Sequence, residues 1–126
     1  MTFRERCDAL EECYEFMLAY AGQGLPAAAG NSPADQVRQY LDRAAVALNG
    51  LAEAIRAEGL ESPFIDVVAK DGRSSLAAIE LVRAAPAIGS QLIDNLNASI
   101  HLRALLTDLF LADEVLKVGA VTSSAR

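Results

Sequence analysis

Apolar residues recur along this chain at alternating intervals of four and three, the spacing that places them on one face of an α-helix. In the first such segment the positions are Phe3, Cys7, Leu10, Tyr14, Met17 and Ala21. In the second segment they are Val37, Leu41, Ala44, Leu48, Leu51 and Ile55. No stretch alternates apolar and polar residues as a half-buried β-strand does. The pattern therefore predicts an all-α chain in which each helix buries one face.

The first expected helix has a clear start signal. Thr2 and Glu5 form a Thr-x-x-Glu capping box, in which the two side chains satisfy free amides of the first turn. We expect this helix to continue through the apolar stretch 16–21, and the segment 22–31, rich in Gly, Ala and Pro, to form a loop.

A second helix is expected between Ser32 and Gly59. Ser32 is a typical N-cap, Pro33 fits the first helical position, and a glycine at position 59 fits a helix end. Asn49–Gly50 is also a turn sequence, but the apolar spacing continues across it. We therefore predict a single helix over this whole segment.

The segment 63–85 has two interpretations. Its apolar and small residues form one continuous helical face with a thin middle, or the segment forms two short helices separated at Asp71–Gly72. We favour two pieces, because residues 71–75 have poor helix propensity. Pro86 should end or kink this stretch.

The last expected helix, 87–118, changes its apolar face along its length. Its first half presents Leu92, Ile93, Leu96 and Ile100, and its second half presents Leu102, Leu105, Leu109 and Leu116. At 100° per residue the two faces differ by about a third of a turn or more. One neighbouring helix cannot cover both faces, so we expect the second half to have an additional partner.

These segments predict one domain, a four-helix bundle over residues 1–118 with a flexible polar tail over 119–126. The 126 residues are enough to enclose one hydrophobic core without a disulfide or a metal ion.

The charge of the chain excludes two classes of partner. The formal net charge is −6, and the Lys and Arg residues are not clustered, so we expect no binding to nucleic acid or to a membrane. The longest uncharged stretch contains glycines and prolines, which does not suit a bilayer-spanning helix, and the start of the sequence does not resemble a signal peptide. We therefore expect a cytoplasmic protein, and the abundance of Ala and Arg hints at a GC-rich bacterial genome.

Cys7 and Cys13 do not predict a disulfide. They lie six positions apart on one expected helix, about 9 Å along its axis, which is too far for a bridge. A reducing compartment is the natural setting for such cysteines. We expect Cys7 to be a small core residue, and acidic neighbours of Cys13 disfavour a reactive thiolate.

His101 is the only histidine of the chain. It shares one side of the last expected helix with Asp94, Asn97 and Asp108, an arrangement that could hold a metal ion or a base. The spacing lacks the Glu-x-x-His and His-Glu-x-x-His motifs of known helical metal sites. We prefer the interpretation of a solvated face, and we expect no metal and no cofactor.

Arg103 is the most unusual polar residue of the sequence. Helical angles extrapolated along the last expected helix place it on the apolar side, where a guanidinium needs a partner. It could hold an anionic ligand inside the bundle, or it could form an internal salt bridge or extend to solvent, and we give more weight to these structural roles. The ligand-binding residues of this hypothesis are Arg103, Ser99, Ser75, Tyr14 and Tyr40.

The second halves of the first and last expected helices are too apolar for the interior of one bundle. The positions concerned are Phe16, Leu18, Tyr20, Leu105, Leu109 and Leu116. Excess apolar surface of this kind marks an interface. We therefore predict a non-enzymatic interaction protein, such as an adaptor, a small chaperone or a regulatory subunit, that forms a homodimer or binds a helical partner. The alternative is a small-molecule binding protein or an all-α enzyme with a pocket around Arg103.

Overall fold

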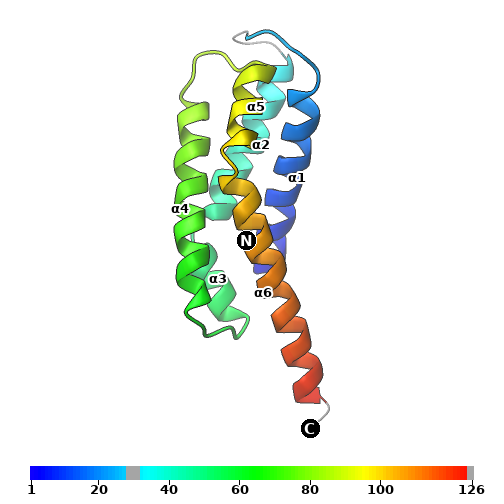
Figure 1. Ribbon diagram of the computed structural model, residues 1–126, viewed down its shortest axis with the longest axis vertical. Coiled ribbons are helices and arrows are strands. Elements are labelled where there is room, and N and C mark those ends of the chain that lie inside the picture. Colours follow the sequence, from blue (N-terminus) through cyan, green and yellow to red (C-terminus); the bar gives the residue numbers. More distant parts are fainter. Residues whose placement is uncertain (28–31, 125–126) are drawn as a thin grey trace.

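The computed structural model describes residues 1–27 and 32–124, and these residues form six α-helices and no β-strand (Figure 1). The helices are α1 (Phe3–Ala21), α2 (Ser32–Leu48), α3 (Leu51–Ala57), α4 (Phe64–Arg83), α5 (Ser90–Ala98) and α6 (His101–Ser124). The all-α class expected from the apolar spacing is confirmed. The helix count of this described part differs from the expected four because two of the expected helices are each divided.

The first division separates α2 from α3 at Asn49–Gly50, so the prediction of one helix there is wrong. Gly50 adopts a left-handed backbone conformation, with φ of 80°, that glycine tolerates without strain. The guanidinium of Arg6 on α1 donates hydrogen bonds to the carbonyl oxygens of Ala47 (2.9 Å), Val46 (3.4 Å) and Asn49. These carbonyl groups lie at and just beyond the end of α2, where a helix leaves its last carbonyl groups short of amide partners, and the Val46 carbonyl also accepts from the amide of Asn49 at 3.2 Å. The apolar spacing continues across the division because Leu48 before it and Leu51 after it are both buried.

The second division separates α5 from α6 at Ser99–Ile100, inside the expected last helix. Ile100 has a φ of 60°, which is rare for a β-branched residue, and the Ser99 hydroxyl donates to the carbonyl oxygen of Leu96 at 2.6 Å. The side chains of α6 are therefore rotated about the helix axis relative to where a straight continuation of α5 would place them. This change accounts for the rotation of the apolar face that the sequence displays.

The segment expected to be broken at Asp71–Gly72 is instead one continuous helix, α4, so the two-piece prediction is wrong. Gly72 is buried in its middle, on the same face as Val68 and Ser75, and packing against α6 and α2 compensates for its poor helix propensity. The helix ends at Arg83, three positions before Pro86. At the other end of the chain, α6 is helical beyond the expected limit of Val118, as far as Ser124.

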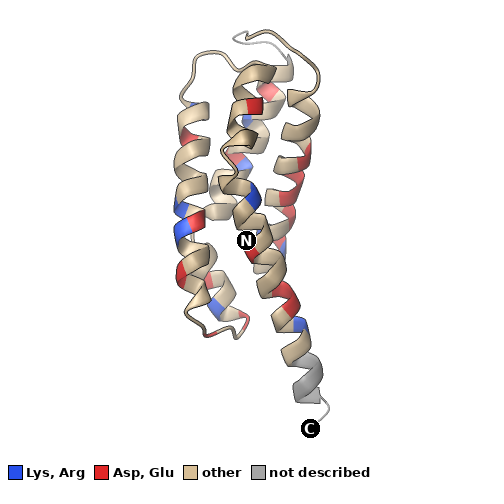
Figure 2. Cartoon of the chain, viewed as in Figure 1, with Lys and Arg blue, Asp and Glu red and all other residues tan. Residues whose placement is uncertain are grey.

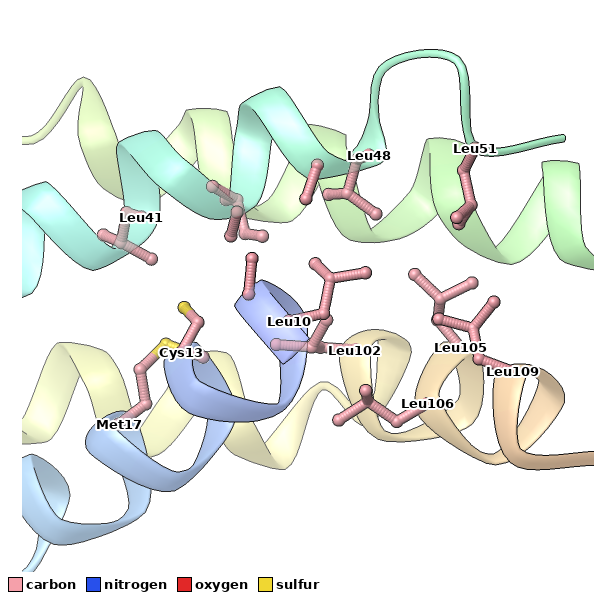
Figure 3. Close-up of a cluster of buried hydrophobic side chains, with 14 of the residues drawn as sticks. Leu10, Cys13, Met17, Leu41, Leu48, Leu51, Leu102, Leu105, Leu106 and Leu109 are labelled. Atoms are coloured by element: carbon pink, nitrogen blue, oxygen red, sulfur yellow. The ribbon is translucent and has the colours of Figure 1, made fainter. Parts of the chain in front are cut away.

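The core lies between α1, α2, α4 and α6 and consists mainly of aliphatic side chains. Figure 3 shows Leu10, Cys13 and Met17 of α1 facing the leucines of α2 and of α6. Helix α1 packs against α2, α5 and α6, while α4, on the other side of the view, packs against α2, α3 and α6 (Figure 1). Burial of these side chains supplies most of the favourable free energy of folding.

A second arginine holds the end of another helix. Arg38 on α2 donates to the carbonyl oxygens of Arg83 (2.9 Å) and Ala85 (2.7 Å), at and just beyond the end of α4. Together with Arg6, this contact means that two helix ends receive their hydrogen-bond donors from a different helix.

Ser90 joins the loop after α1 to the start of α5. Its hydroxyl donates to the carbonyl oxygen of Tyr20 (2.6 Å) and accepts from the amide of Leu25 (2.8 Å), while its own amide donates to the Leu25 carbonyl (2.9 Å). The Tyr20 hydroxyl donates to the carbonyl oxygen of Ile88 at 2.8 Å. The neighbouring Gly89 lies so close to the loop that a Cβ atom there would be 2.6 Å from the Ala27 nitrogen.

We expect the substitution Arg6→Met to lower the free energy of unfolding by about 1.5–3 kcal/mol, because the carbonyl groups at the end of α2 lose charged donors. Arg73→Met is the matched control, since Arg73 is exposed and has no hydrogen bond or ion pair with any described residue. It should change stability by less than about 0.5 kcal/mol. Urea denaturation followed by circular dichroism measures both, and equal effects would contradict the capping role of Arg6.

Two glycine substitutions should have opposite effects. Gly89→Ala should destabilise the protein by about 1–3 kcal/mol or more, because the new methyl group would collide with backbone atoms that cannot move aside. Gly72→Ala should stabilise it by about 0.5–1 kcal/mol, because a Cβ there meets no atom within 4 Å and alanine favours the helix. Thermal denaturation of the two variants tests the pair, and a destabilising Gly72→Ala would show that α4 needs a glycine.

Candidate functional site

Helix α6 carries apolar side chains on two opposite sides. One side faces the core and includes Leu102, Leu105, Leu109 and Ala112, which are 6% exposed or less. The opposite side carries Leu111, Val115 and Val118, which are 49–57% exposed, and Ile100, which is 59% exposed, directly precedes the helix. An amphipathic helix on a protein surface normally places polar residues there.

The outward residues follow a regular pattern, which we call the outer stripe. It consists of Ala104, Thr107, Leu111, Glu114 and Val118, with Val115 beside Glu114 and Ile100 just before the first residue of the helix. The intervals within α6 are again three and four, so at 100° per residue these helical positions lie within a narrow sector of the helix surface. The outer stripe therefore has the spacing of a helix–helix contact but has no helix of the described part over it.

No other described helix shows such a row. The remaining large exposed apolar residues are Met1, Leu18, Val46, Val67, Leu81 and Phe110, and the first five are at least fourteen positions apart along the chain. Single exposed apolar residues are ordinary on soluble proteins, whereas several that recur on one side of a helix indicate a contact surface.

The position of α6 increases the access to this row. Its last turns extend past the ends of α3 and α4 (Figure 1), and most of the positions of α6 that Figure 2 colours are uncharged. Among the described helices, none combines the length and the apolar character that crossing a bilayer requires.

Arg103 lies beside the outer stripe and is exposed, so the expectation that it faces the core is wrong. The error arose because the helical angle was extrapolated through the division at Ile100, where the rotational setting changes. Its guanidinium forms no hydrogen bond or ion pair with any residue of the described chain. The same holds for the carboxylate of Glu114, which is also exposed.

A shallow groove between α1 and α6 brings together Tyr14 and Arg103, two of the five residues predicted to bind a ligand. The groove has about 270 Å³ of space and is also lined by Glu11, Glu15 and Phe110. This volume is below the range of about 300–1,000 Å³ that is usual for small-molecule sites. Two carboxylates beside the arginine also weaken the attraction for an anion.

The other three predicted ligand-binding residues lie elsewhere. Ser75 is buried on α4 and its hydroxyl has no hydrogen-bond partner, while the Ser99 hydroxyl is engaged at the end of α5. Tyr40 on α2 stacks on Phe16, with ring centres 4.2 Å apart. The five residues therefore do not form one pocket.

The six residues predicted to form an interface are mostly part of the core. Tyr20, Leu105 and Leu109 are at most 2% exposed and leave no surface for a partner. Phe16 and Leu116 are partly buried against the core, and the remaining one, Leu18, is 49% exposed. The last helix does carry more apolar residues than its core side needs, but the extra ones lie on the outer stripe and not at the predicted interface positions.

The outer stripe is visible in the sequence as a second set of positions on the last helix that recur at intervals of four and three residues. It is faint because Ala104, Thr107 and Glu114 interrupt the run of large apolar residues. The series stands out only after the core side of α6 has been assigned.

Two carboxyl groups meet between α4 and α6. Asp71 and Asp108 are half-buried and close enough for their charges to interact, and one Asp108 oxygen is buried without a partner among the described residues. Burial, together with the neighbouring Asp71 carboxyl, raises the pKa of Asp108 to about 7. The two neighbouring carboxyl groups are most stable when one of them is protonated.

The remaining polar candidates show no site. His101 and Asp94 are exposed, and Asn97 donates to the Met17 carbonyl oxygen at 3.3 Å. The described residues contain no group of three or more His, Cys, Asp or Glu side chains that could hold a metal ion.

Both cysteines are free and buried in the core. Burial raises the pKa of the Cys7 thiol to about 11 and that of the Cys13 thiol to about 12. Both side chains are therefore thiols at neutral pH, which confirms the core position expected for Cys7.

No protein family, characterised protein or solved structure matches this chain.

We expect the stability of the protein to rise as the pH falls from 8 to 5. The pKa of Asp108 in the folded chain is raised above the unfolded value of about 4, so its contribution is complete below that value and is lost as the pH rises through about 7. Asp108→Asn should remove this dependence and raise the midpoint temperature at pH 8 by a few degrees. Calorimetry across the pH range measures both effects.

The exposed Asp8→Asn is the control for that series, and it should retain the pH dependence of the original protein. A flat pH profile in the original protein, or an Asp108→Asn profile that still slopes between pH 5 and 8, would refute the role assigned to the carboxyl pair.

Proposed function

We propose that this protein is a non-enzymatic interaction protein that binds another protein helix through the outer stripe of α6. The observation that carries the proposal is the second apolar row of α6, opposite the core and about half exposed. Exposing such a row to water is unfavourable, at about 25 cal/mol per Å² of apolar surface, so a partner that covers it gains this free energy.

Helix-in-groove and helix–helix recognition use anchors at positions i, i+4 and i+7 of one helix. Leu111, Val115 and Val118 have this spacing and lie on one side of α6. The proposal therefore specifies the partner surface as an amphipathic helix or a pair of helices. The architecture behind it is a helical bundle in which the expected second and fourth helices each consist of two parts.

The alternative function, binding of an anionic small molecule near Arg103, is supported by two shallow grooves, one along α6 beside Ala104 and Asp108 and one between α1 and α6. The carboxylate of Asp108 in the first groove and those of Glu11 and Glu15 in the second weaken the attraction for an anion, so the alternative is favoured less than a protein partner.

The test compares the protein with Leu111→Asp, which places a charge in the middle of the outer stripe. Leu81→Asp is the matched control, because Leu81 is 76% exposed on α4, outside the stripe. We expect that Leu111→Asp abolishes self-association or the retention of a partner from an extract of the source cells, while Leu81→Asp changes neither. Solution mass and affinity capture with mass spectrometry measure these properties.

The proposal fails if the protein is monomeric at submillimolar concentration and no protein that it retains depends on Leu111. Circular dichroism should show that both variants fold normally, since each replaced side chain is exposed.

A further inference from the structure

We propose that the occupant of the outer stripe is a second copy of this chain, paired antiparallel with twofold symmetry about the level of position 109. The inference rests on the proposed function and deepens it by naming the partner and its register. It is carried by the self-complementary order of the stripe and by the two unpaired charges beside it.

The intervals between Ala104, Thr107, Leu111 and Glu114 read the same in both directions, three-four-three. When a second α6 is reversed and centred at position 109, each of these four positions falls opposite another of them. Thr107 then lies opposite Leu111 and Ala104 opposite Glu114, while Val118 lies opposite the turn at Ile100 that precedes the helix. A surface that matches itself in this way is the requirement of a closed twofold dimer.

The direction of pairing follows from Glu114. In a parallel pair this residue would face its own copy, and two carboxylates would repel each other inside the contact. In the antiparallel pair it faces the small side chain of Ala104 of the other copy. Next to Ala104 is Arg103, so the carboxylate gains an opposite charge in place of a like one.

The ion pair between Arg103 and Glu114 forms twice because of the symmetry. Within one chain both groups are exposed, and neither has an ion pair with the described residues. Phe110 lies on the same edge of the stripe, is 53% exposed, and would meet its own copy close to the twofold axis. An aromatic contact at the centre of an interface, flanked by charged pairs, is typical of stable protein contacts.

The length of the contact is sufficient for a specific pair. From Ala104 to Val118 the helix rises about 21 Å, which provides five stripe levels on each copy. The C-terminal turns of α6 that extend past the other helices leave room for this approach (Figure 1).

The first experiment is sedimentation velocity over a range of concentrations. We expect the protein to reach twice its mass of 13.4 kDa, Leu111→Asp to remain monomeric, and Leu81→Asp to dimerise normally. A monomeric original protein at about 100 μM, equivalent to a free energy of association weaker than about −5.5 kcal/mol, overturns the inference.

The second experiment tests the register by charge reversal. Arg103→Glu and Glu114→Arg should each weaken the dimer by at least about tenfold, because each places like charges together. The double variant with both reversals should recover most of the original affinity, since the ion pair is restored with opposite polarity. If the double variant dimerises no more tightly than the two single variants, the antiparallel register is wrong.

The third experiment tests the orientation by disulfide trapping. A mixture of Ile100→Cys and Val118→Cys chains should form a mixed covalent dimer under mild oxidation, whereas each chain alone should form little. The natural cysteines, Cys7 and Cys13, are buried and do not compete. Efficient linkage of Val118→Cys to itself, without the mixed product, would show a parallel pair and overturn the proposal.

Failure of this inference differs from failure of the proposed function. If the protein is monomeric but still retains another protein in a manner that depends on Leu111, the stripe is an interaction surface and its occupant is a different chain. If it is monomeric and Leu111→Asp changes no binding, both proposals are wrong.

Discussion

The arrangement of the helices depends on hydrogen bonds from one helix to the carbonyl end of another. Arg6 of α1 closes the end of α2, Arg38 of α2 closes the end of α4, and Ser90 of α5 closes the end of α1. The last carbonyl groups of a helix have no partner within it, so these donors satisfy groups that would otherwise oppose packing. The aliphatic core is favourable in many arrangements, whereas these directional contacts fix the position of each helix end.

The sequence was sufficient to predict the local features of this fold but not the contacts between distant residues. The all-α class and the capping box of Thr2 follow from neighbouring residues, and the structure shows both. The end of α2 was not predictable in the same way, because its carbonyl groups are satisfied by an arginine more than forty positions earlier in the chain. The continuity of α4 through Gly72 likewise reflects packing against other helices, and local propensity favoured a break.

The same distinction applies to the candidate site. The excess of apolar residues on the last helix was visible in the sequence, but the side on which it lies depends on the rotational setting of α6. One left-handed residue, Ile100, determines that setting, and its conformation is not expected for a β-branched side chain. The assignment of Arg103, which depended on helical angles continued through that point, therefore placed it inward, whereas it is exposed. The leucines predicted to form an interface because of the apolar excess are buried or partly buried.

The arginines that close helix ends also shape the electric field around the molecule. The chain has 11 basic and 17 acidic residues, and two of the positive charges, those of Arg6 and Arg38, are directed at backbone oxygens. Because the net charge is −6, the field beyond the surface is dominated by carboxylates, and it repels acidic molecules out to about 8 Å at physiological ionic strength. Any acidic partner, including a second copy, must approach against this repulsion and is held only once its surface is in contact with α6. Salt shortens the range of this field and should therefore favour the encounter of two acidic molecules, which is then stabilised by burial of apolar surface.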